Sequence, residues 1–581
     1  QVSDGSGFAA NDVILIDGEQ RTLQAVNGNI ITLTTATTAL HFAGAVMLTT
    51  SGSNFGRGVD IFFDEQTAIE DLQVIGNTIA NSYDDGIRIT REDDAVTRTL
   101  NPVAAQTRAV TIASNTISNN GLNPTAEQLD AAGTQQFGAG VEIVARNGSL
   151  DQLDAELRSN TISRNARLNP TGVDPTDTNG INLRAEADAQ LLVDLTDNVI
   201  NFSEGDGLLL TTRENSSTDS RDIGGTLTKN VFAENGQNGI EVLGRFGIFN
   251  LLVVGLEGVD PVDGQELGNS FIRNDYNGIN IRRGGNASIV GNDFFENGQS
   301  EPRFVAIGAA TPNRTFLEDS AINGSGIHVA NGDNDGSATG GSRFDRNVNL
   351  AIKQNVFESN RGMGIDINSY VNNTITATIR DNLVTQNEND GIEISGPIDV
   401  TMLGNFVDRN EGRGIDLLSF GNGTSTVRQS NYKIGDGQVA GRNTIVGNFE
   451  EGIYYTSSAE VQDQNLLSTN ASSRQANGDQ NSMPAAILQI DTNQVSDNGV
   501  NSAASGTGIV FWVGTSGDVS STFQAYQTAL GTGTGLGSVG GVEDVTDIAI
   551  SLTGLDGTTI PFGEAGLNSR TNARVVNNAF E

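Results

Sequence analysis

The sequence predicts an all-β protein, a parallel β-helix of about twelve coils, from a repeat, from the period of that repeat and from alternating apolar residues. The repeat reads Asn-x-h-x-x-Asn, a short polar turn and then Gly-h-x-h, where h is apolar. One copy runs from Asn230 to Asn235 and continues over Gly239–Val242. The copies begin at Asn77, Asn115, Asn160, Asn198, Asn230, Asn269, Asn292, Asn355, Asn382, Asn405, Asn443 and Asn493.

The period of the repeat indicates three strands per coil. The copies that begin at Asn382 and Asn405 are separated by one complete cycle, and it holds three short strand-like pieces. These are Leu383–Thr385, Gly391–Ile394 and Asp399–Leu403, with Asn, Gly, Asp or Pro between them. Because neighbouring strands lie about 4.8 Å apart, a coil buries its apolar face only by stacking on other coils.

Each position of the repeat has an expected place in a coil. In Gly-Ile-x-Ile the two isoleucines point inward, as in Ile392 and Ile394, because side chains alternate along a strand. The preceding Gly is expected at a sharp bend that needs a positive φ. The recurring Asn residues are interpreted as ladders in the turns, since their amides can both donate to and accept from the backbone and the neighbouring copies.

The two ends of the chain are built differently from the repeat. Residues 1–56 contain Asp-Gly and Asn-Gly hairpin signals and predict a β-rich cap or docking domain. Residues 57–512 are assigned to the β-helix, and residues 513–581 to a second β-rich cap or connector. Insertions that interrupt the repeat are expected to form ridges along its sides. They cover Leu122–Phe137, Gln299–Asn323, Asn331–Arg343, Ser419–Val439 and Ser457–Ala485.

The Asn-containing turn followed by Gly-Ile-x-h resembles the repeat of right-handed parallel β-helix proteins, the superfamily of pectate lyases and polygalacturonases. The resemblance covers about Gly58 to Trp512. It implies the right-handed sense of the coil. It leaves function open, because this scaffold also serves adhesins, phage tailspikes and structural proteins.

The composition narrows the classes of partner. There are 71 acidic and 33 basic residues, for a formal charge of −38. Nucleic acid and anionic membranes are therefore not expected as partners, since both need a basic surface. The chain has no cysteine, and no apolar run long enough to span a membrane. These features favour an extracellular or cell-surface protein, with calcium as the one expected cofactor.

The catalytic sets of the resembling enzymes are missing from the sequence. Polygalacturonase-like proteins carry an Asn-Thr-Asp triplet and a Gly-His-Gly, and pectate-lyase-like proteins carry an Arg-x-Pro-x-x-Arg segment. None of these occurs, and neither His41 nor His328 is flanked by glycines. With two histidines and no cysteine there is also little for zinc or a nucleophilic triad. The chain is therefore predicted not to be an enzyme.

One constellation remains, at the outward x position of Gly-h-x-h. Asp366, Glu393 and Asp416 are expected on adjacent coils, about 5 Å apart. That spacing fits a solvated polar stripe, a calcium site, or the paired carboxylates of a retaining glycosidase. The stripe is the preferred interpretation, with Arg282, Arg361, Arg380 and Arg413 near enough to screen it. Asp333 and Asp335, in an acidic loop, offer a second cation site.

The function predicted from these observations is structural. The chain is expected to self-associate head-to-tail into an extracellular filament, sheath or surface layer, through the unlike ends Gln1–Phe55 and Gly514–Glu581. Its expected partners are copies of itself and an extracellular polysaccharide. The alternative is a polysaccharide lyase or hydrolase, or a glycan-binding tailspike or adhesin, on the same scaffold.

Overall fold

The fold is seen in a computed structural model of the full chain, which describes backbone and side chains over most of the repeats. At both ends it gives strand assignments without side-chain detail. The described repeat residues are 57–64, 72–82, 85–92, 107–121, 138–146, 152–165, 179–186, 189–213, 222–243, 248–260, 264–282, 286–298, 324–331, 348–369, 375–396, 398–420, 430–436, 438–458, 485–491, 493–496 and 498.

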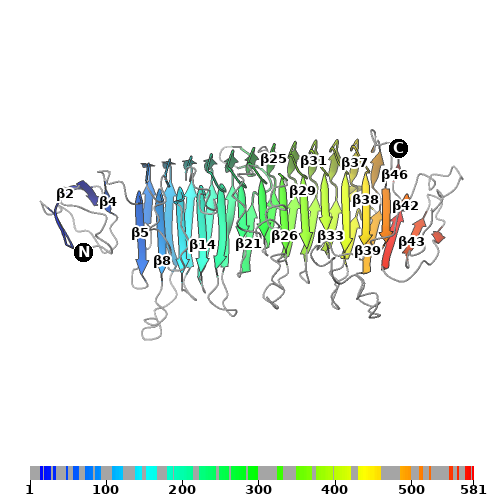
Figure 1. The fold of residues 1–581 in the computed structure, drawn as a ribbon, viewed down its shortest axis with the longest axis horizontal. Coiled ribbons are helices and arrows are strands. Elements are labelled where there is room, and N and C mark those ends of the chain that lie inside the picture. Colours follow the sequence, from blue (N-terminus) through cyan, green and yellow to red (C-terminus); the bar gives the residue numbers. More distant parts are fainter. Residues whose placement is uncertain are drawn as a thin grey trace, which may run out of the picture. The chain divides into compact units, whose positions relative to one another are not determined.

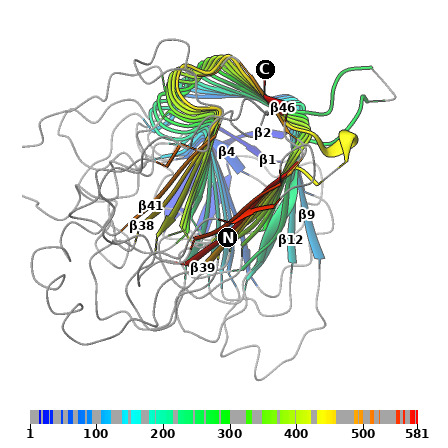
Figure 2. The ribbon, with the colours of Figure 1, turned by 90° about the vertical axis from the view of Figure 1, so that its right-hand side faces the viewer.

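The chain divides into two compact units, Gln1–Val253 in the first and Val254–Pro302 with Thr311–Glu581 in the second. Both are built as a parallel β-helix, and the repeats amount to about twelve coils. The right-handed parallel β-helix is confirmed as the fold class. Figure 1 shows successive strands of each unit side by side, and Figure 2 looks along the coils, so that strands of one sheet lie behind one another.

Each coil contributes one strand to each of three parallel sheets. Sheet 1 holds the Gly-h-x-h segments. Its strands in the first unit are β5 (Val59–Asp64), β8 (Ile87–Glu92), β11 (Val141–Arg146), β14 (Ile181–Glu186), β17 (Leu208–Arg213) and β20 (Ile240–Leu243). In the second unit they are β23 (Ile279–Arg282), β26 (Ile327–Asn331), β29 (Ile365–Ser369), β32 (Ile392–Ser395), β35 (Ile415–Phe420), β38 (Ile453–Ser458) and β41 (Ile509–Gly514).

Sheet 2 follows sheet 1 along the chain. It begins with β6 (Leu72–Ile75), β9 (Thr107–Ala113), β12 (Gln152–Arg158), β15 (Gln190–Thr196), β18 (Asp222–Thr228) and β21 (Ile248–Val254). The second unit adds β24 (Ala287–Val290), β27 (Val348–Lys353), β30 (Ile375–Arg380), β33 (Ile398–Leu403), β36 (Ser430–Ile434), β39 (Ala485–Asp491) and β45 (Arg570–Val576).

Sheet 3 consists of three-residue strands inside the Asn-x-h-x-x-Asn segments and a final two-residue strand. The first unit has β7 (Thr78–Ala80), β10 (Thr116–Ser118), β13 (Thr161–Ser163), β16 (Val199–Asn201) and β19 (Val231–Ala233). The second has β22 (Ser270–Ile272), β25 (Asp293–Phe295), β28 (Val356–Glu358), β31 (Leu383–Thr385), β34 (Phe406–Asp408), β37 (Thr444–Val446), β40 (Gln494–Ser496) and β46 (Ala579–Phe580). A short 3-10 turn, η2, covers Val439–Gly441.

The two ends add antiparallel strands. Near the N-terminus β1 (Val13–Ile16), β2 (Glu19–Asn27), β3 (Ile30–Leu33) and β4 (Met47–Thr49) form an antiparallel sheet, as the hairpin signals predict. Beyond Trp512, β45 still pairs in parallel with β39. β42 (Phe523–Gln524) and β44 (Thr559–Pro561) turn antiparallel, against β41 and β43 (Ile548–Thr553). The predicted boundaries at 56 and 512 stay predictions.

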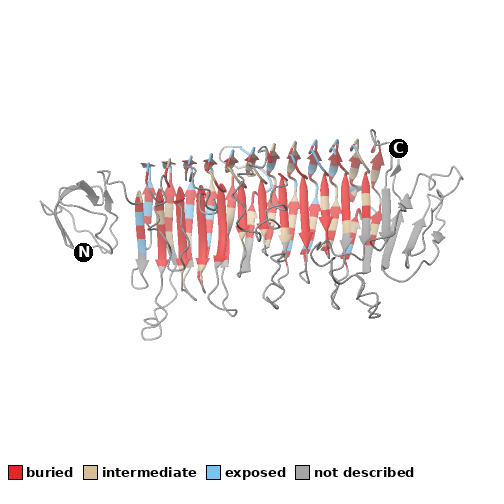
Figure 3. Ribbon diagram, viewed as in Figure 1, coloured by how far each residue is buried: buried red, intermediate tan, exposed pale blue. Residues whose placement is uncertain are grey.

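The inward-facing apolar ladders are confirmed. Ile392 and Ile394 have no exposed surface, and each lies in register with an apolar residue of the next coil. In sheet 3 of the second unit, Phe271, Phe294 and Phe357 stack with ring centroids 4.7 Å apart at each step. Figure 3 shows the buried residues running along the described strands of both units.

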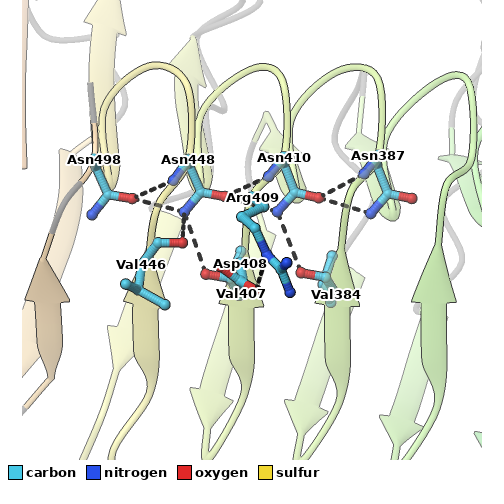
Figure 4. A network of polar contacts seen from close by, with 9 residues as sticks. All are labelled: Val384, Asn387, Val407, Asp408, Arg409, Asn410, Val446, Asn448 and Asn498. Carbon is cyan, nitrogen blue, oxygen red and sulfur yellow. Dashed lines mark hydrogen bonds and ion pairs between the residues drawn. The ribbon is translucent and has the colours of Figure 1, made fainter. Parts of the chain in front are cut away.

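The Asn ladders are also confirmed, and their geometry explains why the residue is Asn. The Asn387 Nδ2 donates to the Asn410 side-chain oxygen at 2.8 Å and to the Phe357 carbonyl at 3.3 Å, while the Asn387 backbone N–H donates to the same Asn410 oxygen at 3.1 Å. Figure 4 follows this ladder from Asn387 through Asn410 and Asn448 to Asn498. Only a side chain with both a donor and an acceptor can continue such a chain.

The Gly before each h-x-h strand was expected to be required by a positive φ, and this reason is wrong. The Gly before each h-x-h strand, such as Gly391, is not among the glycines with positive φ. The left-handed residue instead precedes the ladder Asn, as Gln386 does at φ 57° and Arg409 at φ 51°. A Cβ on Gly391 would lie 2.6 Å from the Val407 Cγ1 and 2.7 Å from the Gly414 carbonyl oxygen. Close approach of the next coil therefore requires this Gly.

Replacing Asn387 with Ala should lower the free energy of unfolding by about 3–5 kcal/mol, because several buried donors and acceptors lose their partner. Urea denaturation would measure the loss. The control is Asn389→Ala, an exposed Asn of the same turn, which should change stability by less than about 0.5 kcal/mol. Equal losses in the two variants would contradict the role of the ladder.

Replacing Gly391 with Ala should cost about 1–3 kcal/mol through overpacking, although the backbone conformation suits alanine. Thermal melting would detect the loss. Gly258→Ala tests the other cause: at φ 95° with open space around the Cβ position, any loss of stability comes from backbone strain and not from overpacking. If Gly391→Ala melts like the wild type, close approach of the coils does not explain this glycine.

Candidate functional site

The outward positions of sheet 1 form one polar row in each unit, in the register that the sequence predicts. In the first unit Arg88 pairs with Glu142, Glu142 with Asn182, Asn182 with Leu209 and Leu209 with Glu241. In the second unit Asn280 pairs with His328, His328 with Asp366, Asp366 with Glu393, Glu393 with Asp416 and Asp416 with Tyr454.

This face of the molecule is buried, unlike the outer face of sheet 2. All five residues of β29 are buried, whereas β30 alternates between buried and partly or fully exposed positions. In the row itself Asp366 has no exposed surface and Asp416 keeps 3%. The preferred interpretation of the row as a solvated stripe is therefore wrong. At the buried positions of this row, unpaired charge is costly.

In the first unit the part of the row around Glu142 is neutralised by ion pairs. Arg88 lies 3.1 Å from one carboxylate oxygen of Glu142, and Arg184 lies 3.7 Å from the other. Arg184 and Arg146 both contact Glu186, at 2.8 and 3.0 Å. Each of these carboxylates meets two guanidinium groups, so this part of the row is explained as a buried ion-pair network.

In the second unit carboxylates outnumber cations. At one end of this stretch, the His328 Nδ1 lies 2.6 Å from one oxygen of Asp366, and the Asn368 amide donates to the other oxygen at 2.6 Å. The short contact fixes the orientation of the buried His328 imidazole against Asp366.

Glu393 is the partly exposed carboxyl in the middle of this stretch. Burial raises its pKa to about 9, with further contributions from the neighbouring Asp366, Asp416 and Asp390. Burial also raises the pKa of Asp390 to about 7, and the charge of Asp416 adds to it. Near neutral pH, Glu393 is therefore a protonated acid among carboxylates.

Asp416 is held on one side only. The Arg413 Nη1 contacts its Oδ2 at 2.5 Å, whereas its buried Oδ1 has no hydrogen-bond partner. The Arg413 guanidinium also lies 3.1 Å from Glu451 and stacks 3.8 Å from the centre of the Tyr454 ring. Arg413 thus fixes the orientation of Asp416 while one carboxylate oxygen stays free.

The predicted site residues have different outcomes. Asp366, Glu393 and Asp416 do lie on adjacent coils. Of the arginines expected to screen them, Arg413 contacts Asp416, while Arg380 pairs with Asp381 at the surface. Asp333 and Asp335 lie outside the described residues. Within the described ranges no group of three or more His, Asp or Glu side chains could hold a metal ion. Calcium at either place stays a prediction.

Sequence reasoning missed a second set of polar contacts, at the residue before many of the Gly-h-x-h segments. The Asp390 Oδ1 accepts from the backbone N–H of Arg413 at 2.5 Å, and the Asp206 Oδ1 accepts from Asn238 at 2.9 Å. The pKa of Asp206 is raised by burial and by Glu241. The signal was present in the sequence, since Asp85, Asn179, Asn277 and Glu451 stand at equivalent positions.

The comparisons with known proteins give structural matches alone. No family model matches the sequence, and no curated protein matches it. Similar solved structures include the periplasmic alginate epimerase AlgG, at 12% identity and a TM-score of 0.36, covering 81% of this chain and 85% of that one. The tailspike gp49 from Pseudomonas phage LKA1 matches at 10% identity and a TM-score of 0.24, over 79% of this chain and 62% of that one.

The prediction that the chain is not an enzyme has to be corrected. The similar structures include an enzyme, the alginate epimerase. The row contains two features that a list of family motifs does not test for: a buried His–Asp pair and a carboxyl with a strongly raised pKa.

Among the described residues no helix has the length and apolar character needed to cross a membrane.

The raised pKa of Glu393 predicts a pH-dependent stability. Its pKa is higher in the folded chain than in the unfolded one, so its contribution is complete below about pH 4 and is lost as the pH rises towards about 9. Glu393→Gln should therefore flatten the decline in melting temperature between about pH 5 and 9. Glu411→Gln removes the same charge at an exposed position and should leave the slope unchanged. Equal slopes in all three proteins would contradict the raised pKa.

Proposed function

We propose that this chain is a glycoside hydrolase that cleaves a neutral extracellular polysaccharide along the outer face of sheet 1 in the second unit. One observation carries the proposal. Glu393, protonated near neutral pH, stands in register with Asp416, a carboxylate with one fixed and one free oxygen. An acid and a carboxylate on adjacent coils, about 4.8 Å apart, fit the separation of about 5–5.5 Å in retaining glycosidases.

Each residue then has a defined part in the reaction. Glu393 gives its proton to the glycosidic oxygen as the bond to the anomeric carbon breaks. The free Oδ1 of Asp416 attacks that carbon and forms a covalent bond, while Arg413 holds Oδ2. A water molecule then displaces Asp416 from the anomeric carbon and returns a proton to Glu393. The product keeps the anomeric configuration of the substrate.

The charge of the site supports a neutral substrate. Burial raises the pKa of Asp390, Glu393 and Asp416, and nearby carboxylates add to each shift. Asp416 acts on Asp390 and Glu393, while Glu451 and Glu450 act on Asp416. Arg413, the cation that contacts this group, is already engaged by Asp416 and Glu451. A polyuronate would bring more negative charge to this buried face and would be repelled.

Self-association into a filament and an extracellular location stay predictions. No described residue argues for the filament. Among the described end strands, β42 pairs antiparallel with β41 and β44 with β43, so these strands use neighbouring backbone groups within the chain. An extracellular polysaccharide is the partner that this proposal retains.

The test is to incubate the full chain with neutral polysaccharides, such as β-1,4-linked glucans and N-acetylglucosamine polymers, and to follow new reducing ends. Glu393→Gln and Asp416→Asn should each lower turnover by about 10²–10⁴-fold without loss of fold. Glu411→Gln, exposed and outside the row, is the matched control and should leave turnover unchanged. The proposal fails if the wild type cleaves none of these polymers, or if Glu393→Gln retains full turnover.

A further inference from the structure

Asn280 is a buried amide without a partner at one end of the row. It lies in β23, has no exposed surface, and stands in register with His328 of β26. Neither its Nδ2 nor its Oδ1 makes a hydrogen bond. Its position is the outward one of Gly-h-x-h, so the amide belongs to the same buried face as Glu393 and Asp416.

Neighbouring Asn residues are satisfied. The Asn274 Nδ2 donates to the Asn297 side-chain oxygen at 3.0 Å, and the Asn277 Oδ1 accepts from the backbone N–H of Ser325 at 2.8 Å. The Asn292 Nδ2 donates to the Val254 carbonyl at 2.8 Å. A buried amide that loses both its donor and its acceptor bonds destabilises the fold, and in native proteins such a group calls for an explanation.

We propose that Asn280 is a substrate-binding residue, a subsite for a sugar group that presents a donor and an acceptor side by side. Neighbouring hydroxyls or an acetamido group have this chemistry, and both complete the two halves of an amide. This inference rests on the proposed function, because it places the glycan along the same row. Asn280 and Glu393 lie three coils apart, about 14 Å at the usual strand spacing, so the subsite is remote from the cleaved bond.

The unpaired Asn280 amide also affects how a glycan reaches this residue. Asn280 has no exposed surface in the ligand-free chain, so a glycan reaches it only when the atoms that shield it move aside. That opening lets the amide find hydrogen bonds that it lacks when shielded, and this lowers the free energy of the open state relative to the closed one. Glu393, by contrast, is already partly exposed.

The experiment compares stability and binding in full-length variants. Asn280→Leu keeps the side-chain volume but removes the unpaired amide, so without any glycan it should raise the melting temperature by about 1–3 °C. Asn277→Leu, the matched control, removes a hydrogen-bonded buried amide and should lower it. Binding is measured with hexamers and dimers of β-1,4-linked glucose and of N-acetylglucosamine, in a Glu393→Gln background that prevents cleavage.

In that background, Asn280→Leu should weaken binding of a hexamer about 10-fold or more, because two hydrogen bonds are lost. Dimers are too short to reach from Glu393 to Asn280, so Asn280→Leu should leave their affinity unchanged. A loss confined to the N-acetylglucosamine hexamer identifies an acetamido ligand, and a loss with the glucose hexamer identifies hydroxyls. Either result supports the subsite.

Three results would overturn the assignment: a melting temperature that falls as for Asn277→Leu, hexamer binding that is unchanged, or no hexamer binding by Glu393→Gln. The first would mean that Asn280 has a structural role. The outcome for the proposed hydrolase is distinguishable from the outcome for the subsite. If the wild type cleaves no polymer, yet the hexamer binds and Asn280→Leu weakens that binding, the subsite stands without the hydrolase.

Discussion

The structure depends on the asparagine amide in the turns. At Asn360, Asn387 and Asn410 one side chain accepts from the backbone and the amide of the coil before it and donates to the coil after it. These bonds satisfy backbone groups that the turn would otherwise bury unpaired, and they fix each coil in register with the next. Within each unit the strands of sheet 1 therefore repeat without a shift, and the outward positions of Gly-h-x-h fall on one row. The candidate site is a consequence of that register.

The repeat let the sequence predict the fold and the composition of the row. The alternation in Ile392-Glu393-Ile394 says which side chains point inward, and the period says which copies are neighbours. What lies over the outer face cannot follow from either signal, because alternation reports direction and not enclosure. For that reason the row was interpreted as solvated, although Asp366 is buried. The glycine error has a similar origin, since the clash at Gly391 comes from the next coil and not from the local backbone.

Family motifs were the wrong test for catalysis. They ask whether the residues of known enzymes recur, whereas the physical signal is an imbalance of charge in one place. The first unit pairs Glu142 with two arginines, and the second leaves Glu393 among carboxylates that raise its pKa. Both rows have the same geometry and arise from the same repeat. The difference between an ion-pair network and a candidate acid therefore lies in a few outward residues, which a solenoid can change without disturbing its ladders.

A solenoid is also suited to carry an unfavourable site. Its stability is roughly a sum over coils and their interfaces, so a costly group at one coil is offset by regular neighbours on both sides. The coils of Asn280, Glu393 and Asp416 contain an unpaired amide, a neutralised acid and a free carboxylate oxygen, while their Asn ladder continues unbroken from Asn269 to Asn443. The Asn280 amide, the Glu393 acid and the free Asp416 oxygen share the outer face of sheet 1, as the proposed binding site requires. If these polar groups were scattered over both faces of the sheet, they would lower the stability of the fold without forming a binding site.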